Sequence, residues 1–208
     1  GTSVGSAAAM VQAAGLVVAA VRWGRVFVVT SAAAGVTNQL VAMAAAAQAG
    51  GQAPGLCQPF VARHDQLAAD LTALFGWPLP GLDAELAAIH GQLHNLVHGV
   101  ALLRDLSPHV LAHLSGLGER AAVACLRAVF QHMGCDPQVL DPIQLLRCTG
   151  DPLQATPDEP AIRLLFEGFR SGSHALGLMA GFFGGDARGK VMSLGRGGSD
   201  WSAALAAA

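Results

Sequence analysis

Residues 25–38 read RVFVVTSAAAGVTN, an apolar run that passes through small residues into a segment of helical spacing. Val26–Val29 are apolar on both faces and mostly β-branched, which is typical of a buried parallel strand. The predicted strand runs from Arg25 to Thr30, Ser31 ends it, and Ala32–Gly35 form a loop. A helix is expected over Val36–Gln48. A strand, a loop and a helix in this order predict an α/β fold.

The flanking sequence extends this pattern. Ser6 can cap a helix that runs to about Arg22, because its hydroxyl can accept from the free N–H groups of the first turn. Ala175–Ala180 is predicted as a second buried strand, and Gln138–Leu140 as a short one between two Asp-Pro pairs. We expect an α/β/α three-layer sandwich around a mainly parallel sheet, with an inserted helical region at about 50–135.

The last third of the chain has less regular spacing. Residues 149–160 hold three of the ten prolines and are predicted as a loop. A helix is expected over 161–170, and glycine-rich loops over 172–198. A final helix is expected over 201–208.

Composition narrows the possible functions. Only 12% of the residues are charged and the net charge is −2, without a block dense in lysine and arginine, so neither nucleic acid nor an anionic membrane is an expected partner. The most apolar stretch, Val4–Val21, is built from alanine and glycine and is predicted as a buried helix, not a membrane span. The four cysteines form no CxxC pair and are expected to be reduced thiols.

Residues 194–200 form the first candidate site, Leu-Gly-Arg-Gly-Gly-Ser-Asp, directly before a predicted helix. Glycines let backbone N–H groups point at an anion, and the helix N-terminus adds a partial positive charge. Arg196 offers a planar fork for a carboxylate or a phosphate. The alternative is a tight turn and an ordinary helix cap, because Ser199 and Asp200 are both good N-cap residues.

Two other segments of small residues are candidates. Gly1–Ser6 precedes a predicted helix and is suited to phosphate by the same physics. Ser31–Asn38 places hydroxyl groups at the carboxyl end of a buried strand, where open α/β sheets bind ligands. For Ser31–Asn38, helix capping is the alternative interpretation.

The order of these segments along the chain resembles the aspartokinases of the amino-acid kinase superfamily. The residues that match motifs of that family are Gly1–Val4, Ser31–Asn38, Gly118-Glu119, Gly181-Phe182 and Leu194–Asp200. Further segments look most like the kinase half of bifunctional aspartokinase–homoserine dehydrogenases: Leu96–Leu103, Leu140–Pro142 and Leu178–Phe182.

The resemblance implies an aspartate kinase that uses ATP with Mg²⁺ to phosphorylate the β-carboxylate of L-aspartate, forming 4-phospho-L-aspartate. This is the first step of lysine, threonine and methionine biosynthesis. It also implies that residues 1–208 are the aspartate-binding N-terminal part of the catalytic domain, cut from a longer chain. The catalytic lysine is then expected before Gly1, and the nucleotide-binding half after Ala208. We expect a cytoplasmic protein that is a homo-oligomer through its parent chain.

The resemblance also implies a role for each matching residue. Arg196 would pair with the α-carboxylate of the substrate, and Glu119 would hold its α-ammonium group. Asp200 would be the catalytic residue that organises the lysine near the transferred phosphoryl group. The other implied substrate-binding residues are Thr37, Phe182, Gly197, Gly198 and Ser199. The implied phosphate and nucleotide loops contain Gly1, Thr2, Ser3 and Ser31.

Two other functions stay open at this stage. A catalytically silent amino-acid-binding domain is suggested by the missing lysine and by Met192-Ser193, which stand where the family often has Thr-Thr. The chain's single lysine, Lys190, is at a different motif position. Another amino-acid or carbamate kinase of the superfamily is the third hypothesis.

Histidines form one pattern outside these motifs. His90, His94 and His98 repeat at i, i+4 and i+8, and His109 and His113 repeat at i, i+4, a spacing that can hold a metal. No HExxH motif accompanies them. A polar helix stripe is the favoured interpretation, and no metal site is expected.

Overall fold

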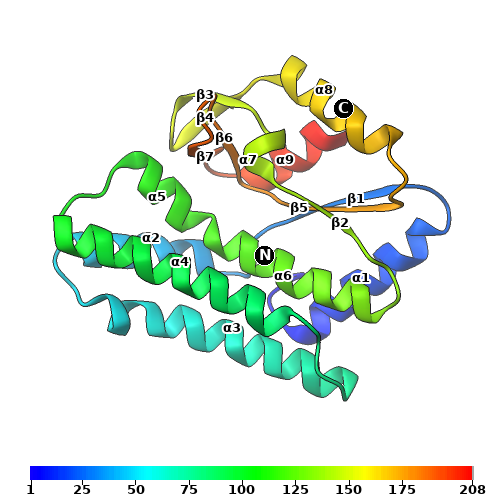
Figure 1. Ribbon diagram of the computed structural model, residues 1–208, viewed down its shortest axis with the longest axis horizontal. Coiled ribbons are helices and arrows are strands. Elements are labelled where there is room, and N and C mark those ends of the chain that lie inside the picture. Colours follow the sequence, from blue (N-terminus) through cyan, green and yellow to red (C-terminus); the bar gives the residue numbers. More distant parts are fainter. Residues whose placement is uncertain (208) are drawn as a thin grey trace.

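A parallel sheet in the order β1-β5-β2 lies at the centre of the computed structural model, which describes residues 1–207 (Figure 1). The strands are β1 (Val26–Thr30), β5 (Leu176–Ala180) and β2 (Gln138–Leu140). Val28 and Val139 flank Leu178 in register, and Leu178 is fully buried. These are the three strands that the sequence predicts, with β1 and β5 each one residue shorter, so the α/β class is confirmed.

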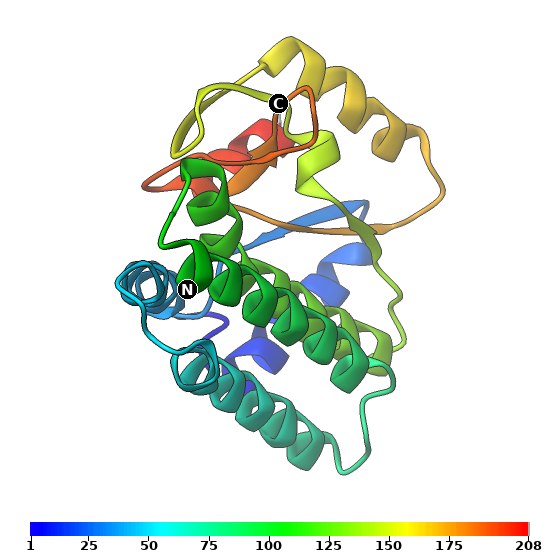
Figure 2. The same ribbon diagram turned by 60° about the vertical axis from the view of Figure 1, so that its left-hand side comes forward.

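Helices lie on both sides of this sheet (Figures 1 and 2). On one side are α1 (Ala7–Val21) and α6 (Leu117–His132); on the other are α8 (Glu159–Ser171) and α9 (Gly198–Ala207). The Ser6 hydroxyl accepts from the N–H of Ala9 at the start of α1, as predicted. Phe27 of β1 packs edge-on against Phe166 and Phe169, which holds α8 on the sheet.

The predicted helical region includes α6, and its other helices pack beside α1 and α6 on the side of the molecule away from α8 and α9 (Figure 2). It contains α3 (Ala53–Phe75), α4 (Leu82–Leu103) and α5 (Pro108–Ser115), and α2 (Val36–Gln48) packs against all three. Buried Phe60, Leu71 and Leu93 belong to its core, which is continuous with the core on the α6 side of the sheet. The prediction of helix over 50–135 is therefore confirmed, with breaks between the helices.

The prediction of a loop over 149–160 is wrong. The segment forms an antiparallel hairpin of β3 (Cys148–Asp151) and β4 (Gln154–Pro157), and α8 starts at Glu159. The three prolines permit this because of where they stand: Pro152 lies in the turn, Pro157 at the end of β4 and Pro160 in the first turn of α8. At these positions a missing N–H removes no interior ladder or helix hydrogen bond.

The glycine-rich segment is also more regular than predicted. It contains a second antiparallel hairpin, β6 (Phe183–Gly185) and β7 (Val191–Ser193). A short helix, α7 (Pro142–Leu145), packs against β6. The last helix begins at Gly198 and not at Trp201, so Ser199 and Asp200 lie within its first turn, and the cap interpretation for them is wrong. Residue 208, the end of the predicted helix, lies outside the described residues.

Two further expectations concern the apolar helices and the thiols. Among residues 1–207, no helix combines the length and the apolar character that crossing a membrane requires. Cys57, Cys125, Cys135 and Cys148 are free thiols, and all but Cys135 are buried. Burial raises the pKa of Cys57 to about 11 and that of Cys125 to about 12, so both stay protonated near neutral pH.

We expect the central strand to dominate stability. Leu178→Ala should lower the free energy of unfolding by about 2–5 kcal/mol, because the removed methyl groups leave a cavity between two packed layers. Leu164→Ala is the matched control, since Leu164 lies on α8 with 68% of its surface exposed. Urea unfolding of both variants tests this, and equal losses would contradict the assigned core.

Candidate functional site

A cavity of about 480 Å³ opens where β1 and β5 end. Its wall comes from the loop after β1, the start of α6, the turn after β5 and the loop that leads into α9. The lining residues are Gly1, Val29, Ser31, Ala32, Ala33, Ala34, Gly35, Thr37, Asn38, Glu119, Phe182, Gly195, Arg196, Gly197, Gly198, Ser199, Asp200 and Ala203. The carboxyl edge of a parallel sheet is where open α/β folds bind ligands.

The cavity brings together nearly all of the residues that the sequence selects. The predicted site residues that line it are Gly1, Ser31, Thr37, Glu119, Phe182, Arg196, Gly197, Gly198, Ser199 and Asp200. Thr2 and Ser3 are exposed and do not line its wall. The carbonyl of Gly1 accepts from the N–H of Ala34 at 3.2 Å, so the N-terminal segment contacts the loop after β1.

Glu119 is the one buried carboxylate of the cavity. It lies in the first turn of α6 with only 2% of its surface exposed, and its Oε2 atom has no hydrogen-bond partner within residues 1–207. Burial raises the pKa of Glu119 to about 7, although backbone N–H groups, including that of Ala32, act in the opposite direction. The side chain is thus poised to accept a hydrogen bond from a cation.

Gly118 allows Glu119 to reach this position. A Cβ atom at residue 118 would lie 2.7 Å from a methyl group of Val36 and 2.8 Å from the Cβ of Ala32. Contacts this short do not occur between real side chains, so α6 can approach the loop after β1 only through a glycine. The Gly118-Glu119 pair therefore acts as a unit, in which the glycine gives the space and the glutamate gives the charge.

The loop 194–198 turns from β7 into α9. The N–H of Leu194 donates to the Phe182 carbonyl at 2.8 Å, and the N–H of Gly198 donates to the Gly195 carbonyl at 3.0 Å. The first turn of α9 borders the cavity, and N–H groups of a first helical turn lack partners within the helix. Arg196 and Asp200 are exposed at the cavity wall. The loop thus presents a cation, an anion and free donors to the same space.

Phe182 adopts a backbone conformation that is unusual for its side chain. Its φ is +74°, a region that an aromatic residue seldom occupies and that costs about 1–2 kcal/mol. The Ser202 hydroxyl, which accepts from the N–H of Phe182 at 3.2 Å, helps to hold it there. Strain of this kind collects at functional sites. The residue was predicted to shape the pocket, but its strain is visible only in the structure.

Sequence reasoning missed one contact that supports the site. Arg63 of α3 donates from its guanidinium to the carbonyl of Ala34 at 3.0 Å, so the helical region holds the loop after β1. The two residues are 29 positions apart, and α3 carries no motif that marks Arg63. Nothing in the sequence pattern alone distinguishes this arginine from an ordinary exposed one.

The histidine pattern lies elsewhere. In the part of the chain that the structure describes, no three His, Cys, Asp or Glu side chains are grouped to hold a metal ion. The Nδ1 atom of His90 is 3.9 Å from a carboxylate oxygen of Asp65, and burial lowers the pKa of His90. His109 bonds through Nδ1 to the carbonyl of Val191 at 3.0 Å.

Comparison of the sequence identifies relatives of one kind. No protein-family model matches the chain. A bifunctional aspartokinase/homoserine dehydrogenase of Buchnera aphidicola is 30% identical over 118 residues, which cover 56% of this chain and 14% of that protein. A protein of the same name from Haemophilus influenzae is 29% identical over 127 residues, covering 61% and 15%.

Solved structures agree with these relatives. Escherichia coli aspartokinase III in complex with aspartate and ADP matches all of this chain and 44% of its own with a TM-score of 0.79 and 27% identity. The same enzyme with lysine and aspartate gives a TM-score of 0.79 and 28% identity, over 45% of its length. Clostridium acetobutylicum aspartate kinase, at 15% identity and a TM-score of 0.75, is similar in fold, over 43% of its length.

The fold and the cavity thus define an α/β domain that is similar to aspartokinases. The resemblance predicted from the sequence is confirmed: the curated relatives are bifunctional aspartokinase/homoserine dehydrogenases, and the structural neighbours are aspartokinases along the whole chain. The chain spans about a seventh of the length of these curated relatives and less than half of the matched structures.

Glu119 should make stability depend on pH in a defined direction. The folded pKa of about 7 lies above the ordinary 4.5, so the folded state holds the proton more tightly and loses stability as pH rises from about 4.5 to 7. Glu119→Gln removes this loss and should be more stable than the native chain at pH 8, by up to about 3 kcal/mol, but not at pH 4.5.

Glu167→Gln is the matched control, because Glu167 is an exposed residue of α8. Urea unfolding at the two pH values measures both differences. A Glu119→Gln variant that is no more stable than the native chain at pH 8 would show that this carboxyl group is not destabilised by its burial.

Proposed function

We propose that this chain is the aspartate-binding N-terminal part of the catalytic domain of an aspartate kinase. The activity is ATP-dependent phosphorylation of the β-carboxylate of L-aspartate to 4-phospho-L-aspartate. The observation that carries the proposal is the buried Glu119 carboxylate with its free Oε2 atom, which shares one cavity with the Arg196 guanidinium. One anion and one cation in a single cavity suit the two charged groups of an α-amino acid.

Arg196 and Glu119 recognise the two charged groups on the α-carbon of the substrate. Arg196 pairs with the α-carboxylate, since its planar fork fits a carboxylate through two parallel hydrogen bonds. Glu119 holds the α-ammonium group, and the pair replaces the water that the buried carboxylate lost. Thr37, Ser199 and the backbone of Gly197 and Gly198 complete the pocket, and Phe182 shapes it.

In this proposal, phosphoryl transfer takes place in the same cavity. ATP supplies the phosphoryl group, and its Mg²⁺ neutralises charge on the phosphates. Asp200, the exposed carboxylate of the lining, is suited to organise a catalytic lysine, and Gly1 and Ser31 contribute to the phosphate side. Transfer of this kind requires mainly positioning and charge stabilisation, which loops and helix N-termini provide.

Lys190 does not serve as the catalytic lysine in this proposal. It is exposed on the β6–β7 hairpin and lines a different cavity, so its ammonium group is not part of the aspartate site. We therefore place the catalytic lysine and the nucleotide-binding half in the rest of a longer protein. The whole catalytic domain is then a three-layer sandwich in a cytoplasmic homo-oligomer that begins lysine, threonine and methionine biosynthesis.

A silent amino-acid-binding domain is the second candidate, and the structure weakens one argument for it. Met192 and Ser193, which depart from the family pattern, are 2% and 3% exposed in β7 and do not line the cavity. Their change from Thr-Thr leaves the lining residues as they are. The remaining distinction between a kinase and a binder is catalytic and is made at Asp200.

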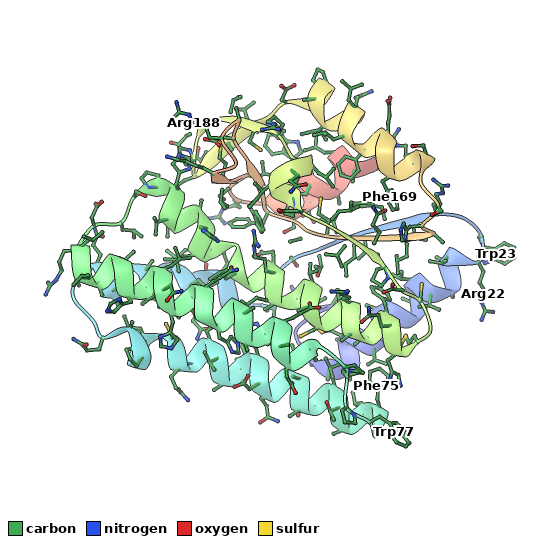
Figure 3. The ribbon with its side chains drawn as sticks, in the orientation of Figure 1. Arg22, Trp23, Phe75, Trp77, Phe169 and Arg188 are labelled. Carbon is green, nitrogen blue, oxygen red and sulfur yellow. The ribbon has the colours of Figure 1, made fainter. Side chains whose placement is uncertain are left out.

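Binding of L-aspartate to the 208-residue chain tests the recognition half of the proposal. Arg196→Gln and Glu119→Gln should each weaken binding at least tenfold, because each leaves one charged group of the ligand without its partner. Arg188→Gln, an exposed arginine on the β6–β7 hairpin outside this cavity, should leave binding unchanged (Figure 3). Isothermal titration calorimetry measures all three, and a native chain that does not bind aspartate would refute the site.

Turnover of the longer protein that contains this chain separates kinase from binder. Asp200→Asn should lower kcat at least tenfold with little change in the KM for aspartate, since its interaction forms mainly in the transition state. Its stability should fall by only about 0.3–1 kcal/mol, the value of a carboxylate in a first helical turn. Full activity of this variant would remove Asp200 from the mechanism, and aspartate binding without turnover in the native protein would favour the silent domain.

A further inference from the structure

A second cavity, of about 580 Å³, lies between α5, the start of α6 and the β6–β7 hairpin. Basic side chains from all three elements line it: His109 and His113 from α5, Arg120 from α6 and Lys190 from the hairpin. The lining also includes the hydroxyl-bearing Ser107. A cluster of basic side chains drawn from three separate elements is not explained by the aspartate site, whose lining contains none of these residues.

No acidic side chain lines this cavity among its basic ones. Within residues 1–207, neither Arg120 nor Lys190 forms an ion pair. The Arg120 guanidinium instead lies over the Phe183 ring, 5.4 Å from its centroid. A cation on an aromatic face keeps its N–H edge available for an anion.

The carboxylate of Asp186 is close to this cluster but is engaged elsewhere. One of its oxygens accepts from the backbone N–H groups of Arg188 and Lys190, each at 2.8 Å. The N–H of Lys190 is the main reason that the pKa of Asp186 is lowered, and the charges of His109 and Lys190 add to the effect. Asp186 therefore closes the hairpin turn, and its single negative charge offsets only part of the positive charge that Arg120 and Lys190 bring to the cavity.

The two histidines differ in their surroundings. The Nδ1–H of His109 donates to the Val191 carbonyl at 3.0 Å, which leaves its Nε2 atom for another partner and ties α5 to β7. Burial, and then the charge of Arg120, lower the pKa of His113. His113 thus experiences the positive charge of Arg120, which an anion would neutralise.

We propose that this second cavity binds an anion of the phosphate class, either inorganic phosphate or the phosphate group of a small ester. Arg120 and Lys190 supply the charge, and His109, His113 and Ser107 supply further polar partners from α5 and its N-cap. Tetrahedral oxyanions accept several hydrogen bonds from different directions, as donors on three elements require. The cavity is of the size that small ligands occupy, so the carbon part of an ester also fits.

This site is independent of the proposed aspartate pocket. Glu119 and Arg120 are consecutive on α6, but they line different cavities. A ligand at Arg120 would link α5 and α6 to the β6–β7 hairpin, whose second strand leads into the loop 194–198. Binding should therefore stabilise the hairpin without occupying the aspartate pocket.

Titration of the 208-residue chain with inorganic phosphate, followed by NMR of labelled histidine rings at constant ionic strength, tests the proposal. We expect saturable shifts of His109 and His113, with the dissociation constant raised at least tenfold in Arg120→Gln and severalfold in Lys190→Gln. Arg188→Gln, on the same hairpin but outside the cavity, and Arg196→Gln, in the aspartate pocket, should both bind phosphate as the native chain does. Lys190 is exposed, so its variant keeps the test informative if Arg120→Gln unfolds.

The other outcomes overturn the proposal or identify the source of the anion. Absent shifts, equal shifts with chloride, or binding lost in Arg196→Gln but kept in Arg120→Gln would each refute a site at this cavity. Glycerol 3-phosphate, with glycerol as its control, separates the two sources. Tighter binding of the ester than of phosphate indicates an esterified ligand, and equal or weaker binding indicates free phosphate.

Discussion

The close approach of two helix starts to one end of the sheet is the constraint on which the rest of the site depends. At Gly118, α6 meets the loop after β1, and at Gly181 the end of β5 meets α9. A Cβ atom at residue 181 would lie 2.9 Å from the Cα of Ser199 and 2.9 Å from a methyl group of Val29. Both contacts leave no room for a side chain. The absence of two Cβ atoms thus brings backbone and charge from distant parts of the sequence into one cavity.

The same constraint sets the electrostatics of the cavity. Because α6 approaches so closely, Glu119 loses its water and has a pKa of about 7, while Arg196 on the opposing loop stays exposed and charged. An empty cavity is therefore unfavourable for the carboxylate, and an ammonium group in it restores the lost interactions. Folding holds this carboxylate in a destabilised ionised state that a ligand relieves, which is how preorganised binding sites gain selectivity.

Much of the fold could be predicted because its signals are local. The strands Val26–Thr30 and Leu176–Ala180 are apolar on both faces. Ser6 caps α1 through its side-chain hydroxyl, and the N–H group that it accepts from is only three residues away in the sequence. The hairpin over 148–157 was missed because three of the ten prolines of the chain lie within 149–160. Proline disrupts a strand or a helix only at positions where a backbone N–H must donate a hydrogen bond. The sequence does not reveal which positions those are before the pairing of the strands is known.

The candidate site shows the same division between local and distant information. Three short motifs mark the site in the sequence: Gly118-Glu119, Gly181-Phe182 and the loop that carries Arg196. Their residues could therefore be selected from the sequence, and almost all of them line the cavity. Arg63, which holds the Ala34 carbonyl, and the φ of +74° at Phe182 could not be predicted. Both depend on how elements pack across long sequence separations, and neither leaves a mark in the residue pattern around it.

Helix α6 separates the two cavities, and its geometry explains how neighbouring residues serve opposite charges. Successive residues of an α-helix point about 100° apart, so Glu119 and Arg120 face different sides of the same first turn. Glu119 points to the loop after β1, and Arg120 to the Phe183 ring and the β6–β7 hairpin. Because β7 runs from the basic cavity into the loop that carries Arg196, the hairpin is a short physical connection between the two. The two cavities nevertheless have no lining residue in common, so each can be occupied without the other.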